Sequence, residues 1–162
     1  MVFQRFRNWL KQSKVSHKQS HVTTPSSDHW KNFENWMTWP RQQNWKRRPI
    51  LEGKYHVDVT PGRGNLDYRV YKRPKDRDNH IGRFYVRSNV HFGRPVLSVM
   101  NASVDAGHQR KGIGMAVYSM IKEDTKHTGL ELWPQGPGGE TSDEAKGLWR
   151  KLDPEKAKKM WG

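Results

Sequence analysis

The residues best suited to chemistry lie in a short basic loop, Gln109–Gly114, between a predicted strand and a predicted helix. The first backbone N–H groups of a helix lack partners within the helix, and the helix dipole places positive charge beside them. A helix start of this kind binds anions, and phosphate in particular. Gly112 and Gly114 would let the backbone approach a phosphate closely, while Arg110 and Lys111 would add charge. The loop is therefore predicted to hold a phosphorylated ligand.

Two common phosphate-binding motifs do not fit this loop. The dinucleotide-binding fingerprint needs a third glycine where Val117 stands, and a P-loop would end in Gly-Lys-Ser or Gly-Lys-Thr. The loop instead resembles the signature of the GNAT family of N-acetyltransferases, Gln/Arg-x-x-Gly-x-Gly/Ala, which Gln109-Arg-Lys-Gly112-Ile-Gly114 matches. A second stretch, Ser142-Asp-Glu-Ala145-Lys-Gly-Leu-Trp149, is similar to the Asn-x-x-Ala-x-x-x-Tyr that family members often carry on their last helix. The resemblance covers residues 96–152.

The resemblance implies that acetyl-CoA is the cofactor and that its acetyl group is transferred to an amine. It also implies that the loop backbone binds the pyrophosphate and that the strand end near Ala102–Val104 pairs with the pantetheine arm. In the family's direct mechanism the amine is held against the thioester while a base removes its proton and an acid protonates the departing thiolate. The residues implied to bind acetyl-CoA are Ala102, Val104, Gln109, Arg110, Lys111, Gly112, Ile113 and Gly114.

Departures from the family pattern leave catalysis open. Trp149 stands where the family commonly has the tyrosine that protonates the thiolate, and an indole N–H is too weak an acid to replace it. Asp153-Pro154 replaces the Gly-Phe that follows this helix in the family. The family's last strands have no counterpart before Gly162, so a C-terminally short domain is expected.

No residue is marked out by its position as a general base. Asp105 and Glu131 lie near predicted strand ends and are weak candidates, although carboxylates at such positions are more often solvated. Tyr118 is a third weak candidate, as an acid, but its place on the predicted helix favours packing. His108 adjoins the loop, where it either contacts the ligand or is a turn residue.

Composition predicts polyanionic partners and no transmembrane segment. The chain has 30 Lys and Arg against 16 Asp and Glu, a formal charge of +14, which attracts nucleic acid, phosphorylated cofactors or anionic lipid. No run approaches the roughly 20 apolar residues of a membrane-spanning helix. The chain has no cysteine, so disulfides and thiolate metal sites are excluded. His17 and His21 have the i, i+4 spacing of metal ligands, but no third ligand is nearby, so no metal site is expected.

Residues 1–49 are predicted to form a basic, Trp-rich helical arm with a linker. Apolar residues recur at helical spacing in 2–10, and a second helix is expected from a cap at Asp28 to the residue before Pro40. The aromatic face of this second helix either docks on the domain or on a partner, which its helical spacing favours, or stacks on nucleic-acid bases beside the basic run Lys46-Arg47-Arg48. That face comprises Trp30, Phe33, Trp36 and Met37, and it is followed by Trp39 and Trp45.

The composition of the arm leaves the compartment open. Residues 1–27 are basic, contain several Ser and Thr and have no acidic residue, which fits a simple basic arm and also a mitochondrial presequence. The cytoplasm or the interior of a phage particle is favoured, with the mitochondrial presequence as the alternative.

Residues 50–162 are predicted to form the acetyltransferase-like domain, an α/β (α+β) fold with a mixed central sheet flanked by helices. Hydrophobic periodicity predicts strands at 55–60, 66–72, 81–90, 96–104 and 130–133, and helices at 112–125 and 142–152. The strand–helix–strand order from residue 96 predicts a βαβ unit with a parallel strand pair. Residues 155–162 are expected to add at most a short basic helix.

Three functions are compatible with these patterns. The leading one is an acetyl-CoA-dependent N-acetyltransferase whose basic arm recruits an acceptor associated with nucleic acid. The alternative is a non-catalytic GNAT-fold structural or assembly protein of a phage particle or nucleoprotein complex, anchored through the arm. The third is a nucleic-acid-binding protein, whose affinity would fall steeply with salt.

Overall fold

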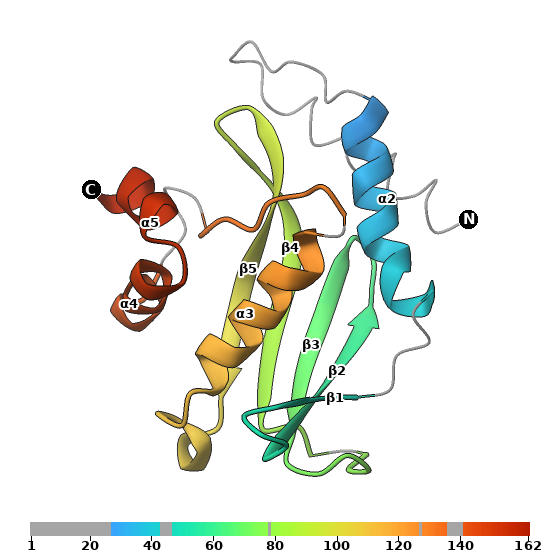
Figure 1. Ribbon diagram of the computed structural model, residues 1–162, viewed down its shortest axis with the longest axis vertical. Helices are drawn as coiled ribbons and strands as arrows, with labels where there is room; N and C mark the ends of the chain where they lie inside the picture. The colour runs from blue at the N-terminus through green and yellow to red at the C-terminus, as the bar shows by residue number, and fades with distance from the viewer. Residues whose placement is uncertain (1–26, 43–46, 78, 127, 136–140) are drawn as a thin grey trace.

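The computed structural model describes residues 27–42, 47–77, 79–126, 128–135 and 141–162. It shows a mixed α+β fold, in which a five-stranded antiparallel sheet is flanked by helices (Figure 1). The strands follow one another across the sheet in chain order. They are β1 (Arg48–Ile50), β2 (Tyr55–Pro61), β3 (Asn65–Tyr71), β4 (Gly82–His91) and β5 (Arg94–Val104). The helices are α2 (Ser27–Gln42), α3 (Ile113–Lys126), α4 (Asp143–Leu152) and α5 (Pro154–Trp161), with a 3₁₀ turn η1 at Ala106–His108.

One face of the sheet carries the core. Tyr68 of β3 and Phe84 of β4 are buried in the same cluster as Val117 and Ile121 of α3. Because successive side chains of a strand point to opposite faces, the chain neighbours of these buried residues face the other side of the sheet; Arg83, next to Phe84, is an example. Four predicted strands and the helix after residue 112 are confirmed, because strict alternation and a helical apolar stripe identified which side chains the core would bury.

The aromatic face of α2 docks on this core. Phe33, Trp36 and Met37 are buried and belong to the same cluster as Val57 of β2. Docking onto the domain, the favoured interpretation of this face, is confirmed for these three residues. The predicted end of the helix before Pro40 is wrong, since α2 continues to Gln42. A proline in the last turn removes one helical hydrogen bond, and the buried residues of the turn before it hold the helix in place.

Strand β1 was not predicted. Arg48 pairs with Val57 and Ile50 with Tyr55, so the sheet begins inside the stretch that the sequence assigned to the arm. Three residues that include Pro49 are too short a run to show a period.

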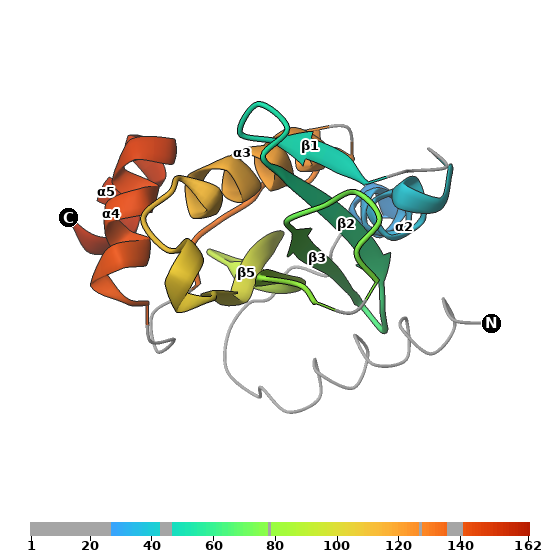
Figure 2. The ribbon, with the colours of Figure 1, turned by 90° about the horizontal axis from the view of Figure 1, so that it is seen from below.

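The predicted strand at 130–133 joins the sheet at a single parallel bridge. Leu97 N–H donates to Glu131 O at 2.9 Å, and Trp133 N–H donates to Leu97 O at 2.8 Å. The sheet is therefore mixed only at this bridge. The last predicted helices are confirmed as α4 and α5, which lie beyond the β5 edge, on the side away from α2 (Figures 1 and 2).

Several expectations lie outside the described residues. They concern the helix in 2–10, the linker, the histidine pair His17 and His21, and the side chains of Trp30, Trp39 and Trp45. The predicted cap at Asp28 is wrong, because α2 begins at Ser27 and Asp28 lies inside it. In the part of the chain that is described, no helix is long and apolar enough to cross a membrane. The same residues contain no group of three or more His, Asp or Glu able to hold a metal ion.

Candidate functional site

The backbone of the loop Gln109–Gly114 has the geometry of an anion-binding turn. The φ angle is +60° at Arg110 and +85° at Gly112, whereas that of Lys111 between them is not positive. Alternating handedness along the backbone directs successive N–H groups toward one side, which makes a concave anion site. The side chains of Arg110 and Lys111 are exposed beside it.

The start of α3 adds further N–H groups to this site. The first helical hydrogen bond runs from Ala116 N–H to Gly112 O at 3.1 Å. Among the described residues, the N–H groups of Ile113, Gly114 and Met115 find no acceptor. The positive end of the helix dipole lies at the same place. The loop and the helix start therefore form one continuous surface of backbone donors.

Neighbouring side chains brace the loop. Gln109 Nε2 donates to Val104 O at 2.9 Å, which ties the loop to the end of β5. His108 Nδ1 lies 3.1 Å from Tyr55 Oη, and the two rings meet edge to face at 5.7 Å. His108 is thus a turn residue packed on β2, and its contact with a ligand stays a prediction. A braced loop keeps its donors in place before a ligand arrives.

The end of β5 presents an open backbone edge next to the loop. A β-bulge at Met100 interrupts the pairing with β4, and a bulge bends its strand. Beyond the bulge, Asp105 N–H bonds to Ile81 O at 2.8 Å. Since strand residues alternate the side of their hydrogen bonds, the backbone groups of Ala102 and Val104 point away from β4. The parallel bridge occupies this edge only at Leu97, on the other side of the bulge.

Helix α4 approaches α3 at the same end of the site. A Cβ atom on Gly114 would lie 3.4 Å from Leu148 Cδ1, so α3 and α4 pack closely at this point. Trp149 is 2% exposed and meets the Tyr118 ring edge to face at 6.0 Å. The stretch that resembles the family's last-helix motif is thus a packing surface against α3.

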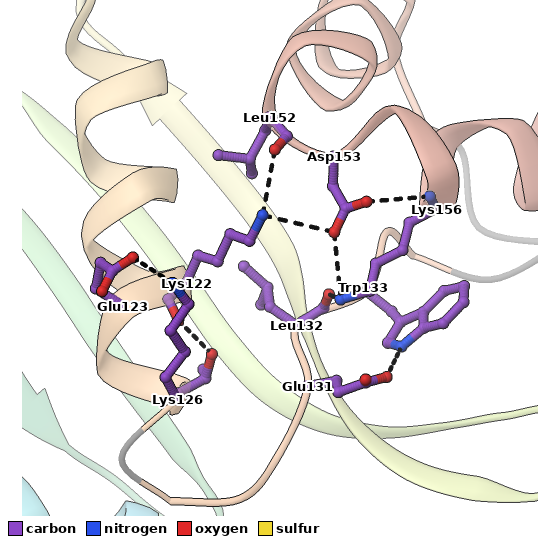
Figure 3. A network of polar contacts seen from close by, with 10 residues as sticks. Lys122, Glu123, Lys126, Glu131, Leu132, Trp133, Leu152, Asp153 and Lys156 are labelled. Carbon is purple, nitrogen blue, oxygen red and sulfur yellow. Dashed lines mark hydrogen bonds and ion pairs between the residues drawn. The ribbon is translucent and has the colours of Figure 1, made fainter.

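A polar network fixes α4 and α5 to α3 and to the bridge segment (Figure 3). Lys122 Nζ donates to Leu152 O at 3.2 Å and lies 3.6 Å from Asp153 Oδ2. Lys156 Nζ donates to Leu132 O at 2.8 Å, while its backbone N–H bonds to Asp153 Oδ1 at 3.2 Å. Burial alone would raise the pKa of Asp153, but the hydrogen bond from Lys156 N–H and the charges of Lys156 and Lys122 lower it overall. Asp153-Pro154, the departure from the family pattern, therefore closes α4 and caps α5.

The candidate catalytic residues do not converge. Asp105 is exposed at the loop end of β5, whereas Glu131 is exposed beside the bridge at the other end and accepts a hydrogen bond from Trp133 Nε1 at 2.9 Å. Tyr118 is buried between Phe84 and Trp149, and this burial raises its pKa to about 12. A phenol with so high a pKa is a weaker proton donor than an ordinary tyrosine.

The opposite face of the sheet has a cavity at the bulge. Its volume is about 340 Å³, and it is lined by Arg83, Tyr85, Met100, Asn101 and Ser103. Arg83 forms a salt bridge with the buried Asp67 at 2.9 Å, which fixes its guanidinium at the rim. Sequence reasoning missed this cavity because it depends on the pairing of β4 with β5.

A buried ionic cluster was also missed. The guanidinium of Arg48 donates two hydrogen bonds to Asp124, at 2.8 and 2.7 Å, and Tyr68 Oη donates to Asp124 Oδ2 at 2.7 Å. Arg47 stacks on the Tyr71 ring with its Cζ 3.6 Å from the centroid. Arg47 and Arg48 thus make contacts within the domain. This does not favour the interpretation in which the basic run binds nucleic acid beside stacked tryptophans.

Two buried tyrosines predict a loss of stability at high pH. Desolvation and the neighbouring Asp124 charge raise the pKa of Tyr68 well above 10.0, and desolvation raises that of Tyr118 to about 12. A raised pKa in the folded state gives stabilisation that is complete below the unfolded pKa and is lost as pH rises through the folded one. The free energy of unfolding should therefore fall from about pH 10 upward, and less steeply in Tyr118→Phe. Urea unfolding at several alkaline pH values measures this, with Tyr85→Phe as the control; equal slopes in the two variants would contradict it.

Comparison with known proteins gives a likeness to acetyltransferases. No family model matches the sequence, and no curated protein matches it. The chain is similar to an aminoglycoside acetyltransferase from an uncultured soil metagenomic sample, solved with trehalose, at 13% identity over 95% of this chain and 84% of that chain, with a TM-score of 0.44. It is similar to a Trypanosoma brucei acetyltransferase at 19% identity over 56% of this chain and 61% of that chain, with a TM-score of 0.44. A second soil aminoglycoside acetyltransferase gives 20% identity, 56% and 59% coverage and a TM-score of 0.43. Likeness of this degree assigns neither a family nor an activity.

Proposed function

We propose that the chain binds acetyl-CoA between the start of α3 and the open edge of β5, and transfers its acetyl group to an amine. The observation that carries the proposal is the continuous surface of backbone donors from Arg110 to Met115, at the end of a strand whose outward backbone groups, apart from Val104 O, have no partner among the described residues. The resemblance of Gln109–Gly114 to the GNAT signature supports the same assignment.

The residues present fit such a ligand. The backbone N–H groups of the loop would bind a diphosphate, and Arg110 and Lys111 would neutralise its remaining charge. The outward groups of Ala102 and Val104 would pair with the amides of the pantetheine arm as a neighbouring strand does. Val104 O is shared with Gln109 Nε2, so this pairing relies on the N–H groups and on Ala102 O.

The bulge at Met100 connects the two sides of the proposed site. Acetyl-CoA supplies a thioester, whose carbonyl carbon accepts the amine. The acceptor would approach from the cavity on the opposite face, where Asn101 and Ser103 offer hydrogen bonds. Holding the amine beside the thioester supplies much of the rate enhancement. Tyr85 lines this cavity and would donate a proton to the departing thiolate, a role that the buried Trp149 cannot fill.

Calorimetric titration with acetyl-CoA at moderate salt tests the proposal, with adenosine 3′,5′-bisphosphate as a control for attraction to a +14 chain. We expect saturable binding at one site, tighter than for the control, because only acetyl-CoA reaches the edge of β5. In a transfer assay over a panel of amines, Tyr85→Phe should lower turnover and leave acetyl-CoA affinity unchanged. Binding no tighter than the control would overturn the proposal.

A second candidate is a domain that binds the ligand without transferring the acetyl group. The buried tryptophan in place of the family's proton donor favours it. One-site binding without transfer to any amine of the panel, in wild type and Tyr85→Phe alike, is the result expected of such a domain.

A further inference from the structure

The tip of the β4–β5 hairpin exposes apolar side chains. Val90 is 58% exposed and Phe92 is 72% exposed, and among the described residues these are the large hydrophobic side chains that face solvent. Phe92 and Gly93 form the two-residue turn that links the paired residues His91 and Arg94, and Val90 lies just before it in β4. Two side chains are too few for a protein–protein interface of ordinary size.

Phe92 occupies a backbone conformation that disfavours it. Its φ is +52° and that of Gly93 is +73°, the pattern of a two-residue turn that normally carries Asn, Asp or Gly. A bulky side chain at positive φ is strained, and the exposed ring of Phe92 recovers little by burial. Such strain is retained where a side chain has a role in binding. The turn therefore displays a mostly exposed aromatic ring, which the domain contacts through Trp133 and His91.

A pocket with aromatic walls and a basic rim lies against this tip. Its volume is about 390 Å³, within the range of roughly 300–1,000 Å³ typical of small-ligand sites. Trp133 stacks on His91 at 6.0 Å and meets Phe92 edge to face at 5.7 Å. The charged residues of the lining are Arg94, Lys159 and Glu131, and Glu131 is engaged by Trp133 Nε1 (Figure 3).

The available charge at this pocket is positive. Arg94 and Lys159 are exposed and form no ion pair with a described residue. Lys159 Nζ lies 5.8 Å and Lys156 Nζ 5.2 Å from the centroid of the Trp133 ring. Burial lowers the pKa of His91, whose buried ring supports Trp133 from behind and adds no positive charge to the pocket. Exposed aromatic rings beside cations are the features that bind single-stranded nucleic acid.

We infer that the tip of the β4–β5 hairpin and α5 together form a binding site for single-stranded nucleic acid, in which a base stacks on Phe92 and adjacent phosphates contact Arg94 and Lys159. The site is separate from the proposed acetyl-CoA site, because the eleven residues from Arg94 to Val104 span about 30 Å of extended strand. The inference does not rest on the proposed function, so acetyl-CoA is not expected to displace the nucleic acid.

Fluorescence anisotropy of a labelled single-stranded oligonucleotide with the full chain tests the inference. Phe92→Asn should weaken binding about 10-fold or more through lost stacking, while the turn folds at least as well with asparagine at positive φ. Arg94→Gln with Lys159→Gln should weaken binding and reduce the slope of log affinity against log salt by about 1.4. Inorganic polyphosphate, which has no bases, should bind Phe92→Asn as it binds wild type.

The control is the double variant Lys75→Gln with Arg77→Gln, which removes the same charges from the exposed β3–β4 connection. Loss of two positive charges anywhere on the chain lowers affinity slightly at low salt. Apart from this small loss, the control variant should keep oligonucleotide affinity within about twofold of wild type. An equal loss in both double variants would show attraction to net charge alone and overturn the site. Unchanged affinity in Phe92→Asn, displacement by acetyl-CoA, or binding to anionic vesicles in preference to the oligonucleotide would also overturn it.

Discussion

Replacing Gly112 by valine is expected to weaken acetyl-CoA binding by roughly 100-fold or more. A side chain with a Cβ is strained by about 1–2 kcal/mol at the φ of +85° that Gly112 adopts, and a β-branched one more so. The loop would relieve this strain by turning its N–H groups away from their common side. Each hydrogen bond from the backbone to a charged group is worth about 1.5–3 kcal/mol, so the loss of two accounts for the expected change.

Space around the loop is not the reason for this effect. A Cβ on Gly112 would meet only Leu51 Cδ2, at an ordinary distance of 3.6 Å. Gly107 provides the matched control, because its φ is not positive and a Cβ there would have no atom within 4 Å. Calorimetric titration of Gly107→Val should give nearly wild-type affinity. Wild-type affinity in Gly112→Val, with the fold intact by circular dichroism, would show that the loop backbone does not hold the ligand.

Removing the carboxylate of Asp124 is expected to destabilise the fold by about 3 kcal/mol, because Asp124→Ala leaves the buried Tyr68 hydroxyl without its acceptor and removes the carboxylate that binds the half-buried Arg48 guanidinium. Asp124 is 3% exposed, and it joins the end of α3 to β1 through Arg48 and to β3 through Tyr68. For a chain of this size the melting temperature should fall by roughly 10 °C or more. Thermal and urea unfolding followed by circular dichroism measure the change.

Asp143→Ala is the control for this prediction, since the Asp143 side chain is fully exposed and its removal should change stability far less than Asp124→Ala does. Adding Arg48→Met to Asp124→Ala should recover part of the lost stability, because an apolar side chain needs no partner there. A loss below about 1 kcal/mol in Asp124→Ala would mean that water replaces the carboxylate.

The elements that bury one regular face could be predicted from the sequence. The alternation of Tyr55–Thr60 and the apolar stripe of α3 indicate burial directly, because apolar residues recur at the positions that face the core. The turn at Phe92-Gly93 gave no comparable signal, since phenylalanine is not a residue expected at positive φ. Pro40 gave a misleading signal for the end of α2, because tertiary packing of Trp36 outweighed the local preference of proline to end a helix.

The candidate site also contains parts that could be predicted from the sequence and parts that could not. The loop from Gln109 to Gly114 is continuous in the chain, so the spacing of its glycines could be read directly. The cluster of Arg48, Tyr68 and Asp124 is assembled from residues up to 76 positions apart, and in the sequence Arg48 is one member of the basic run Lys46-Arg47-Arg48. The assignment of Ala102 and Val104 to the ligand stays a prediction, although the bulge at Met100 provides a physical reason for an open edge there.

The attachment of α4 has a thermodynamic consequence for the loop. Leu148 packs against Gly114, while Lys122 and Lys156 anchor the junction of α4 and α5 to α3 and to the bridge segment. For the proposed ligand, seating of these helices and occupation of the loop would be coupled equilibria, and coupling between two events is reciprocal. The free energy by which seated α4 strengthens ligand binding equals the free energy by which bound ligand would stabilise α4 and α5 against local unfolding.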